Sequence, residues 1–239
     1  MYTHHKVDHE FPAGVPTRRS YMVCSVPRCG SSLLCELLCN TQVAGAPTEF
    51  FDPELMGRFS ERWGAASRAE YLACLLERKT SPNGVFGIKV HWAQLEAMLG
   101  DADPAAVFPG LRYVYIRRAD ELRQAVSWVR ALQTDQWAST HAARAEAVFD
   151  REQIAHYVDL IRAQDRSWEE FFARRAISPH RVSYERLVQA PRQTVRDTLR
   201  YLGVDGGADP SAVPLTLEQQ ADRLTEEWVT RYRAAPARP

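Results

Sequence analysis

Short apolar runs alternate with amphipathic stretches along this chain. The first run, Ser20–Val26, has the length of one buried strand and ends at the break Pro27–Gly30. From Ser31 to about Asn40, the leucines fall on one face of a helix. The same alternation predicts further buried strands at Val85–Val90, Leu111–Ile116 and Arg181–Tyr184, and further helices at Arg68–Lys79, Asp120–Leu132, Asp150–Arg175, Pro191–Leu202 and Leu217–Tyr232.

This order of elements is typical of an α/β fold. Strands that alternate with helices form a parallel sheet covered on both faces, which gives three layers, αβα. A binding crevice is then expected beyond the carboxyl ends of the strands. Residues 1–19 predict a flexible N-terminal segment, and residues 20–239 predict a single domain with a loop at Asp205–Pro214.

Composition and charge exclude several classes of protein. The chain has 30 Lys and Arg against 30 Asp and Glu, so it lacks the basic excess of a broad nucleic-acid surface. It contains no apolar run long enough to span a membrane, and its start lacks the apolar core of a signal peptide, which favours the cytoplasm. The cysteines are odd in number, 5, and none forms a C-x-x-C pair, so we expect reduced thiols and no metal site.

The loop between the first strand and its helix has the composition of a phosphate cradle. Backbone N–H groups at a helix start have no internal partner, and the helix dipole favours an anion there. Gly30 allows a close approach, Ser31 and Ser32 add hydroxyl donors, and Arg28 adds a fixed cation. Cys29, a thiol beside a cation at a helix start, is expected to have a lowered pKa. An ordinary strand-to-helix turn is the alternative, because the loop lacks the Walker pattern.

This loop resembles the 5′-phosphosulfate loop of sulfotransferases. Four further segments, in the same order, resemble the bacterial trehalose sulfotransferase family: Gly45–Phe51, Gly84–Gln94, Arg118–Ala131 and Leu217–Tyr232. The resemblance covers nearly the whole chain, from about Tyr21 onward. One departure is Ala46, which stands where the trehalose enzymes tend to have Glu near the acceptor.

The resemblance implies a P-loop-like sulfotransferase architecture and a sulfuryl-transfer reaction. The family transfers a sulfuryl group from 3′-phosphoadenosine 5′-phosphosulfate (PAPS) to a sugar hydroxyl and releases 3′,5′-bisphosphoadenosine (PAP). By resemblance, residues 28–32 hold the 5′-phosphosulfate, Arg118 and Ser127 hold the 3′-phosphate, and Glu49 is the catalytic base. The acceptor would be a carbohydrate, a sugar-bearing metabolite or a glycolipid, no metal would be needed, and a homodimer is possible.

The residue types suit this chemistry. A carboxylate can accept the proton of an acceptor hydroxyl, and the apolar neighbours of Glu49 are expected to raise its pKa. Lys89 and His91 lie on one face if the strand continues, so Lys89 is expected to give electrostatic support. His91 is an alternative base, as in the similar Lys-x-His of cytosolic animal sulfotransferases, or else a helix-start residue.

Three further residues are weaker candidates. Trp92 is a candidate for the acceptor site, and Gln220 and Arg223 are candidates for closing over the donor.

Two other functions stay open. One is a P-loop-like nucleotide kinase, which the missing Walker lysine argues against. The other is a non-catalytic nucleotide-binding module. The sequence does not name the acceptor or its hydroxyl.

Overall fold

A four-stranded parallel sheet forms the centre of the protein. The computed structural model describes residues 7–137, 142, 144–204, 206, 209 and 223–234. The strand order is β2-β1-β3-β4, and every neighbouring pair is parallel. The predicted parallel sheet is therefore confirmed. The strands are β1 (Arg19–Ser25), β2 (Val85–His91), β3 (Arg112–Arg117) and β4 (His180–Ser183).

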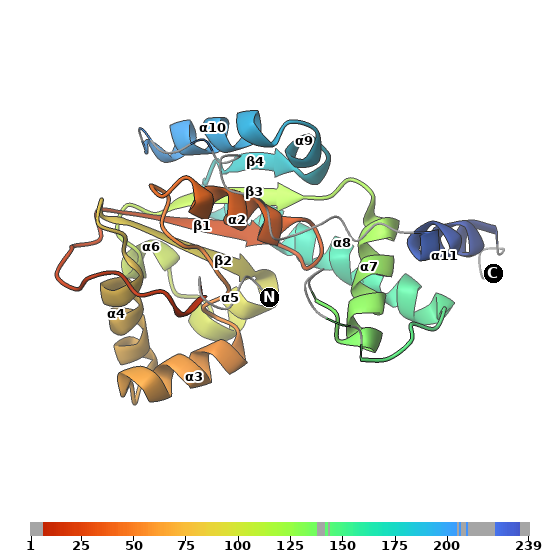
Figure 1. The fold of residues 1–239 in the computed structure, drawn as a ribbon, viewed down its shortest axis with the longest axis horizontal. Helices are drawn as coiled ribbons and strands as arrows, with labels where there is room; N and C mark the ends of the chain where they lie inside the picture. Colours follow the sequence, from red (N-terminus) through yellow and green to blue (C-terminus); the bar gives the residue numbers. More distant parts are fainter. Residues whose placement is uncertain are drawn as a thin grey trace.

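Helices cover both faces of this sheet, as predicted. In Figure 1, α9 and α10 lie at the top, α3, α4 and α5 lie below the sheet, and the strand arrows point toward α7 and α11. No helix in the described ranges is both long and apolar enough to cross a membrane. The helices are α2 (Ser31–Asn40), α3 (Pro53–Trp63), α4 (Arg68–Lys79), α5 (Trp92–Leu99), α6 (Pro104–Val107), α7 (Glu121–Thr134), α8 (Arg151–Arg174), α9 (Tyr184–Gln189), α10 (Pro191–Leu202) and α11 (Arg223–Ala234).

The central strand β1 contributes to two separate cores. Tyr21 and Val23 pack with α2 and α10 on one face of the sheet, whereas Met22 and Cys24 pack on the other face with α4, α5, α7 and α8. Successive strand residues point to opposite faces, so a strand covered on both sides must be apolar throughout. This double burial explains the uninterrupted apolar run in the sequence.

A glycine in β2 makes room for a ring from β1. Tyr21 pairs with Gly87 across the two strands, and a Cβ atom at Gly87 would lie 2.5 Å from Cζ of Tyr21. The Tyr21 hydroxyl donates a hydrogen bond to the carbonyl of Ala44 at 2.7 Å. The ring therefore ties the sheet to the segment that leads to Glu49.

Among the helices in the described residues, four were not predicted from the sequence: α3, α5, α6 and α9. The helix α3 begins where Asp52 accepts hydrogen bonds from the backbone N–H groups of Glu54 and Leu55. The predicted loop 205–214 and the first residues of the predicted helix 217–232 lie largely outside the described residues. The described part of that helix is α11.

The described part of the N-terminal segment lies against α4. Val7 is buried, and the Nζ atom of Lys79 donates to the carbonyls of Val7 and His9 at 2.9 and 2.7 Å. The N–H of Phe11 donates to the carbonyl of Arg78 at 2.9 Å. These bonds hold residues 7–11 along the end of α4.

Candidate active site

The loop after β1 leads into α2 without a side-chain cap from its N-cap residue, Gly30. Gly30 precedes α2 with a φ of 87°, and Arg28 also has a positive φ, 68°. Because Gly30 has no side chain, it cannot cap the N–H groups of the first helical turn. A Cβ atom at Gly30 would also lie 2.5 Å from Cδ2 of Tyr184. Both the backbone conformation and the neighbouring ring therefore require glycine here.

Positive charge gathers around Arg28. Its Nε atom donates to Oγ of Ser127 at 2.9 Å, and its guanidinium also donates to the carbonyl of Trp137. Burial lowers the pKa of Arg28, and the like charges of Arg118 and Arg130 lower it further. The structure thus joins Arg28, expected at the 5′ end of the donor, to Ser127, expected at the 3′ end.

Tyr184 connects the loop with Arg118. The Cζ atom of Arg118 lies 4.6 Å from the centre of the Tyr184 ring, which is in the range of a cation–π contact. The same ring packs against Gly30. Sequence reasoning missed Tyr184 because it took this residue as the end of a strand, whereas it is the first residue of α9.

Lys89 connects the loop with Glu49. The Nζ atom of Lys89 donates to Oγ of Ser32 at 3.0 Å and forms an ion pair with Oε1 of Glu49. The backbone N–H of Lys89 also donates to the carbonyl of Thr48 at 2.9 Å, which fixes the chain beside β2. Glu49 therefore lies next to the amino end of α2, and its side chain is 27% exposed.

His91 lies on the same side of β2 as Lys89 and also contacts Glu49. Its Nε2 atom is 3.5 Å from Oε2 of Glu49, and its Nδ1 atom is 3.0 Å from Oγ of Ser25. The carbonyl of Ser25 accepts a hydrogen bond from the indole of Trp168 at 3.1 Å. His91 also precedes α5 as its N-cap residue, which confirms its placement at a helix start.

The expectation of a raised pKa for Glu49 is wrong. Burial does raise the pKa, but the charges of Lys89 and His91 and their hydrogen bonds outweigh it and hold it well below 4.5. The two neighbouring phenylalanines, Phe50 and Phe51, are buried in the core. The sequence pattern showed the apolar neighbours along the chain but not the contacts of Glu49 with Lys89 and His91 from β2.

The expectation of a lowered pKa for Cys29 is also wrong. The Cys29 side chain is 1% exposed and packs into the core between the sheet, α2 and α10. Burial raises the pKa of its thiol to about 11. Position at a helix start therefore does not activate this cysteine, because its side chain faces the core.

Two glutamines support the site and were given no role from the sequence. The Nε2 atom of Gln124, in α7, donates to the carbonyl of Pro27 at 2.8 Å and so holds the loop. The Nε2 atom of Gln94, in α5, donates to Oε2 of Glu49 at 2.9 Å. Both lie in segments that resemble the sulfotransferase family, and this resemblance was the sequence signal that could have placed them at the site.

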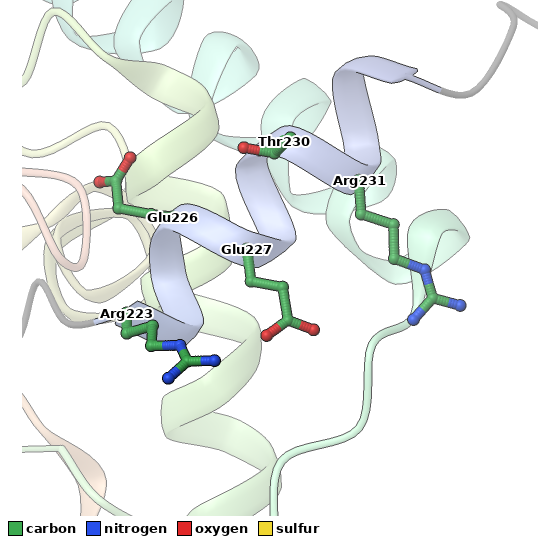
Figure 2. Close-up of a pocket in the computed structure, with 5 residues that line it drawn as sticks. All are labelled: Arg223, Glu226, Glu227, Thr230 and Arg231. Atoms are coloured by element: carbon green, nitrogen blue, oxygen red, sulfur yellow. The ribbon is translucent and has the colours of Figure 1, made fainter.

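The roles of the weaker candidates stay predictions, and one of the three lies outside the described residues. The Trp92 ring meets Trp168 edge-on at 5.2 Å, so it packs between α5 and α8. Arg223 begins α11, and Gln220 is outside the described residues. Within the described ranges, no group of three His, Cys, Asp or Glu residues could hold a metal ion. Figure 2 shows Arg223 in a hollow whose lining residues all come from α11: Arg223, Glu226, Glu227, Thr230 and Arg231.

Comparison with known proteins identifies the class. A family model described as Stf0 sulphotransferase matches residues 20–235, so the chain belongs to this family and is a sulfotransferase. It is 32% identical to the trehalose 2-sulfotransferase of Mycolicibacterium smegmatis over 90% of this chain and 94% of that protein. It is also 32% identical to the trehalose 2-sulfotransferase of Mycobacterium tuberculosis, over 92% of this chain and 96% of that protein.

Solved structures show weaker likeness. The sulfotransferase from Alicyclobacillus acidocaldarius is 17% identical, with a TM-score of 0.48 over 91% of this chain and 92% of that chain. A mouse sulfotransferase, SULT7A1 complexed with PAP, is 13% identical, with a TM-score of 0.47 over 95% of this chain and 70% of that chain. The family assignment rests on the sequence matches.

Proposed function

We propose that this protein transfers a sulfuryl group from PAPS to a hydroxyl group of a sugar, with Glu49 as the general base. One observation carries the proposal: Lys89 bonds both to Ser32 at the amino end of α2 and to the carboxylate of Glu49. A sulfuryl group at the amino end of α2 would lie beside a carboxylate that can accept a proton. The names of the two trehalose 2-sulfotransferases support the same reaction type.

The charges near the loop suit a donor that is anionic at both ends. The first turn of α2, together with the side chains of Ser31 and Ser32, would bind the 5′-phosphosulfate. Arg28 lies between this end and Ser127, and Arg118 is close enough to lower the pKa of Arg28. Arg118 and Ser127 would therefore bind the 3′-phosphate with Arg28 between the two anionic groups.

In the proposed step, the acceptor oxygen forms a bond to sulfur while Glu49 takes the proton of that hydroxyl. The bond between sulfur and the bridging oxygen breaks, its electron pair stays on the 5′-phosphate, and PAP leaves. Lys89 and Arg28 would stabilise the negative charge on the transferred group and on the leaving oxygen. Because Lys89 and His91 hold the pKa of Glu49 well below 4.5, the base is ionised at neutral pH.

The acceptor is proposed only as a sugar hydroxyl. Trehalose is the natural reference acceptor, because both relatives are named for it. Ala46, where the trehalose enzymes tend to have Glu, is the reason to include other sugars, sugar-bearing metabolites and glycolipids. The cytoplasmic location, the homodimer, the single domain and the absence of a metal requirement stay predictions.

The test is a mass-spectrometric screen of acceptors with PAPS as the donor. We expect one sugar to gain a single sulfuryl group and PAP to be released. Glu49→Gln should lower kcat about 10²–10⁴-fold and leave PAP binding intact. Arg28→Ala should weaken PAP binding, measured by calorimetry. Arg174→Ala is the matched control, because Arg174 is 65% exposed in α8 and lies 3.7 Å from Glu170.

Other outcomes would favour the other functions. Magnesium-dependent release of ADP from ATP, without sulfation, would indicate a nucleotide kinase. Binding of PAP without transfer to any acceptor, unchanged by Glu49→Gln, would indicate a non-catalytic module.

A further inference from the structure

Gln94 occupies the space between Glu49 and the start of α5. It is the third residue of that helix. Its Oε1 atom accepts a hydrogen bond from the backbone N–H of His91 at 2.9 Å, and its Nε2 atom donates to Oε2 of Glu49 at 2.9 Å. One side chain therefore connects a helix start to the carboxylate of the proposed base.

The backbone fixes which way this amide faces. A backbone N–H can only donate, so the carbonyl oxygen of Gln94 must face His91. The NH₂ group of Gln94 must then face Glu49, and it can only donate there. A hydrogen bond to an ionised carboxylate is stronger than one to a neutral group, so this contact favours the ionised form of Glu49.

The two carboxylate oxygens of Glu49 have different partners. Oε1 pairs with Lys89, whose Nζ atom also donates to Ser32 at the amino end of α2. Oε2 contacts His91 from β2 and Gln94 from α5. Lys89 is a charged group already bonded to the proposed donor loop, so an anion bound there would attract it. Gln94 is neutral and is held by a backbone N–H.

We propose that Gln94 is a positioning residue that holds Oε2 of Glu49 in place while Lys89 turns to the sulfuryl donor. The proposal rests on the proposed function, because it takes Glu49 as the base. With Lys89 engaged by the donor, Gln94 and His91 keep the carboxylate oriented toward the acceptor. Gln94 acts through Glu49 and does not touch the reacting atoms.

The test compares two variants of Gln94 with the wild type. Gln94→Glu keeps an acceptor for the N–H of His91 but places a negative oxygen against Glu49. Like charges disfavour ionisation, so the Glu49 pKa should rise by about one unit or more. Gln94→Met removes the hydrogen bond without adding charge, and should raise the pKa by a smaller amount. The Glu49 pKa is measured by carbon NMR of glutamate-labelled protein, with Glu49→Gln used to assign the signal.

Activity gives a second readout. In Gln94→Glu, the acidic limb of the kcat/KM profile should move to higher pH, and raising the pH should restore part of the rate. We expect kcat at neutral pH to fall about 10-fold or more, with KM for PAPS changed less than about twofold. A purely structural role would instead lower stability without moving the pH profile.

Gln193→Glu is the matched control. Gln193, in α10, donates to Oδ1 of Asp197 at 2.9 Å, so this variant makes the same change at the same kind of hydrogen bond at an exposed position. It should leave kcat and the Glu49 pKa unchanged.

Two results overturn the proposal: an unchanged Glu49 pKa in both Gln94 variants, or unchanged kcat and pH profile in both. If Gln94→Glu does not fold, the measurements on Gln94→Met decide the test. Because the NMR measurement needs no turnover, it separates this inference from the proposed function. If the Glu49 pKa shifts but no acceptor is sulfated, the effect of Gln94 on Glu49 stands and the proposed function is rejected.

Discussion

Lys79 and Lys89 are equally buried, at 2% exposure, but they have different kinds of partner. Lys79 donates to two backbone carbonyls and lies 4.6 Å from the centre of the Phe59 ring. Lys89 instead bonds to a hydroxyl and a carboxylate, those of Ser32 and Glu49. Burial alone therefore does not separate the lysine that anchors a segment from the lysine proposed to act in catalysis.

The partners explain the difference. Backbone carbonyls and rings are fixed by the fold, so the ammonium of Lys79 has one arrangement and serves to hold the N-terminal segment. The side-chain partners of Lys89 can rotate, so its ammonium can exchange one oxygen for another without unfolding anything. A buried charge with exchangeable partners is suited to chemistry, whereas one with fixed partners is suited to anchoring.

The largest expected effect comes from Lys89→Met. Loss of this cation should lower kcat/KM about 10²–10³-fold, because transition-state charge loses a preorganised partner. Burial raises the pKa of Glu49 and Lys89 opposes it, so the pKa should rise in the variant and the acidic limb of activity should move to higher pH. Steady-state rates between about pH 4 and pH 9, with thermal unfolding as the control, measure both effects. A full rate in a folded variant would remove Lys89 from the mechanism.

Lys79→Met should show the opposite pattern. The carbonyls of Val7 and His9 lose their donor, so the free energy of unfolding should fall by about 1–3 kcal/mol, measured by urea denaturation. Activity should stay within about twofold of the wild type, since no proposed group is touched. Limited proteolysis should cleave the N-terminal segment of the variant faster than that of the wild type. A loss of activity as large as that of Lys89→Met would contradict the distinction between the two lysines.

The stability difference between the wild type and Lys79→Met should also depend on pH. Burial lowers the pKa of Lys79 from 10.5 to about 8. Between these values the unfolded chain binds this proton more tightly than the folded protein, so the contribution of Lys79 to stability rises with pH across this window. From about pH 8 to pH 10.5, the unfolding free energy of the wild type should therefore rise relative to that of Lys79→Met.

The smallest effect is expected for Glu10→Gln. Glu10 accepts hydrogen bonds from the Trp63 indole at 2.8 Å and from Arg78 at 3.3 Å, and its side chain is 26% exposed. Partly exposed pairs contribute little, so we expect a loss of about 0.5–1 kcal/mol and an unchanged rate. Burial raises the pKa of Glu10 but its hydrogen bonds lower it overall, so its contribution is present above about pH 4.5 and is lost as pH falls through the lowered pKa. A loss of activity comparable to that of Glu49→Gln would show that a carboxylate near Lys79 also matters to the reaction.

The strands β1, β2 and β3 could be predicted because each is largely buried and reads as an apolar run, whereas β4 has one buried residue, Val182. The helix α3 could not, because Phe59 is its one buried residue in the structure. Its usable signal was Asp52 followed by Pro53, a cap and a favoured first residue. Apolar pattern thus missed a helix that contributes a single buried residue to the core, and its cap was the better signal.

In the site, alternation along β2 was enough to place Lys89 and His91 on one face. The pKa directions of Glu49 and Cys29 were not predictable, because they depend on packing between distant segments. For Glu49 the decisive contacts come from Lys89 and His91 in β2, and for Cys29 the decisive factor is a core closed by α10. Local sequence shows which groups are present, but not which of them meet.

The hydrogen bond from Trp168 to Ser25 has a consequence for synthesis of the chain. It joins residues 143 positions apart, at the point where β1 meets the loop. A ribosome adding about 5–20 residues per second needs on the order of 10 s to make that stretch. Throughout this interval, the nascent β1 segment has neither its indole donor nor the α8 surface that covers it. A chaperone that shields apolar strands should therefore bind the growing polypeptide before release, and the finished enzyme far less.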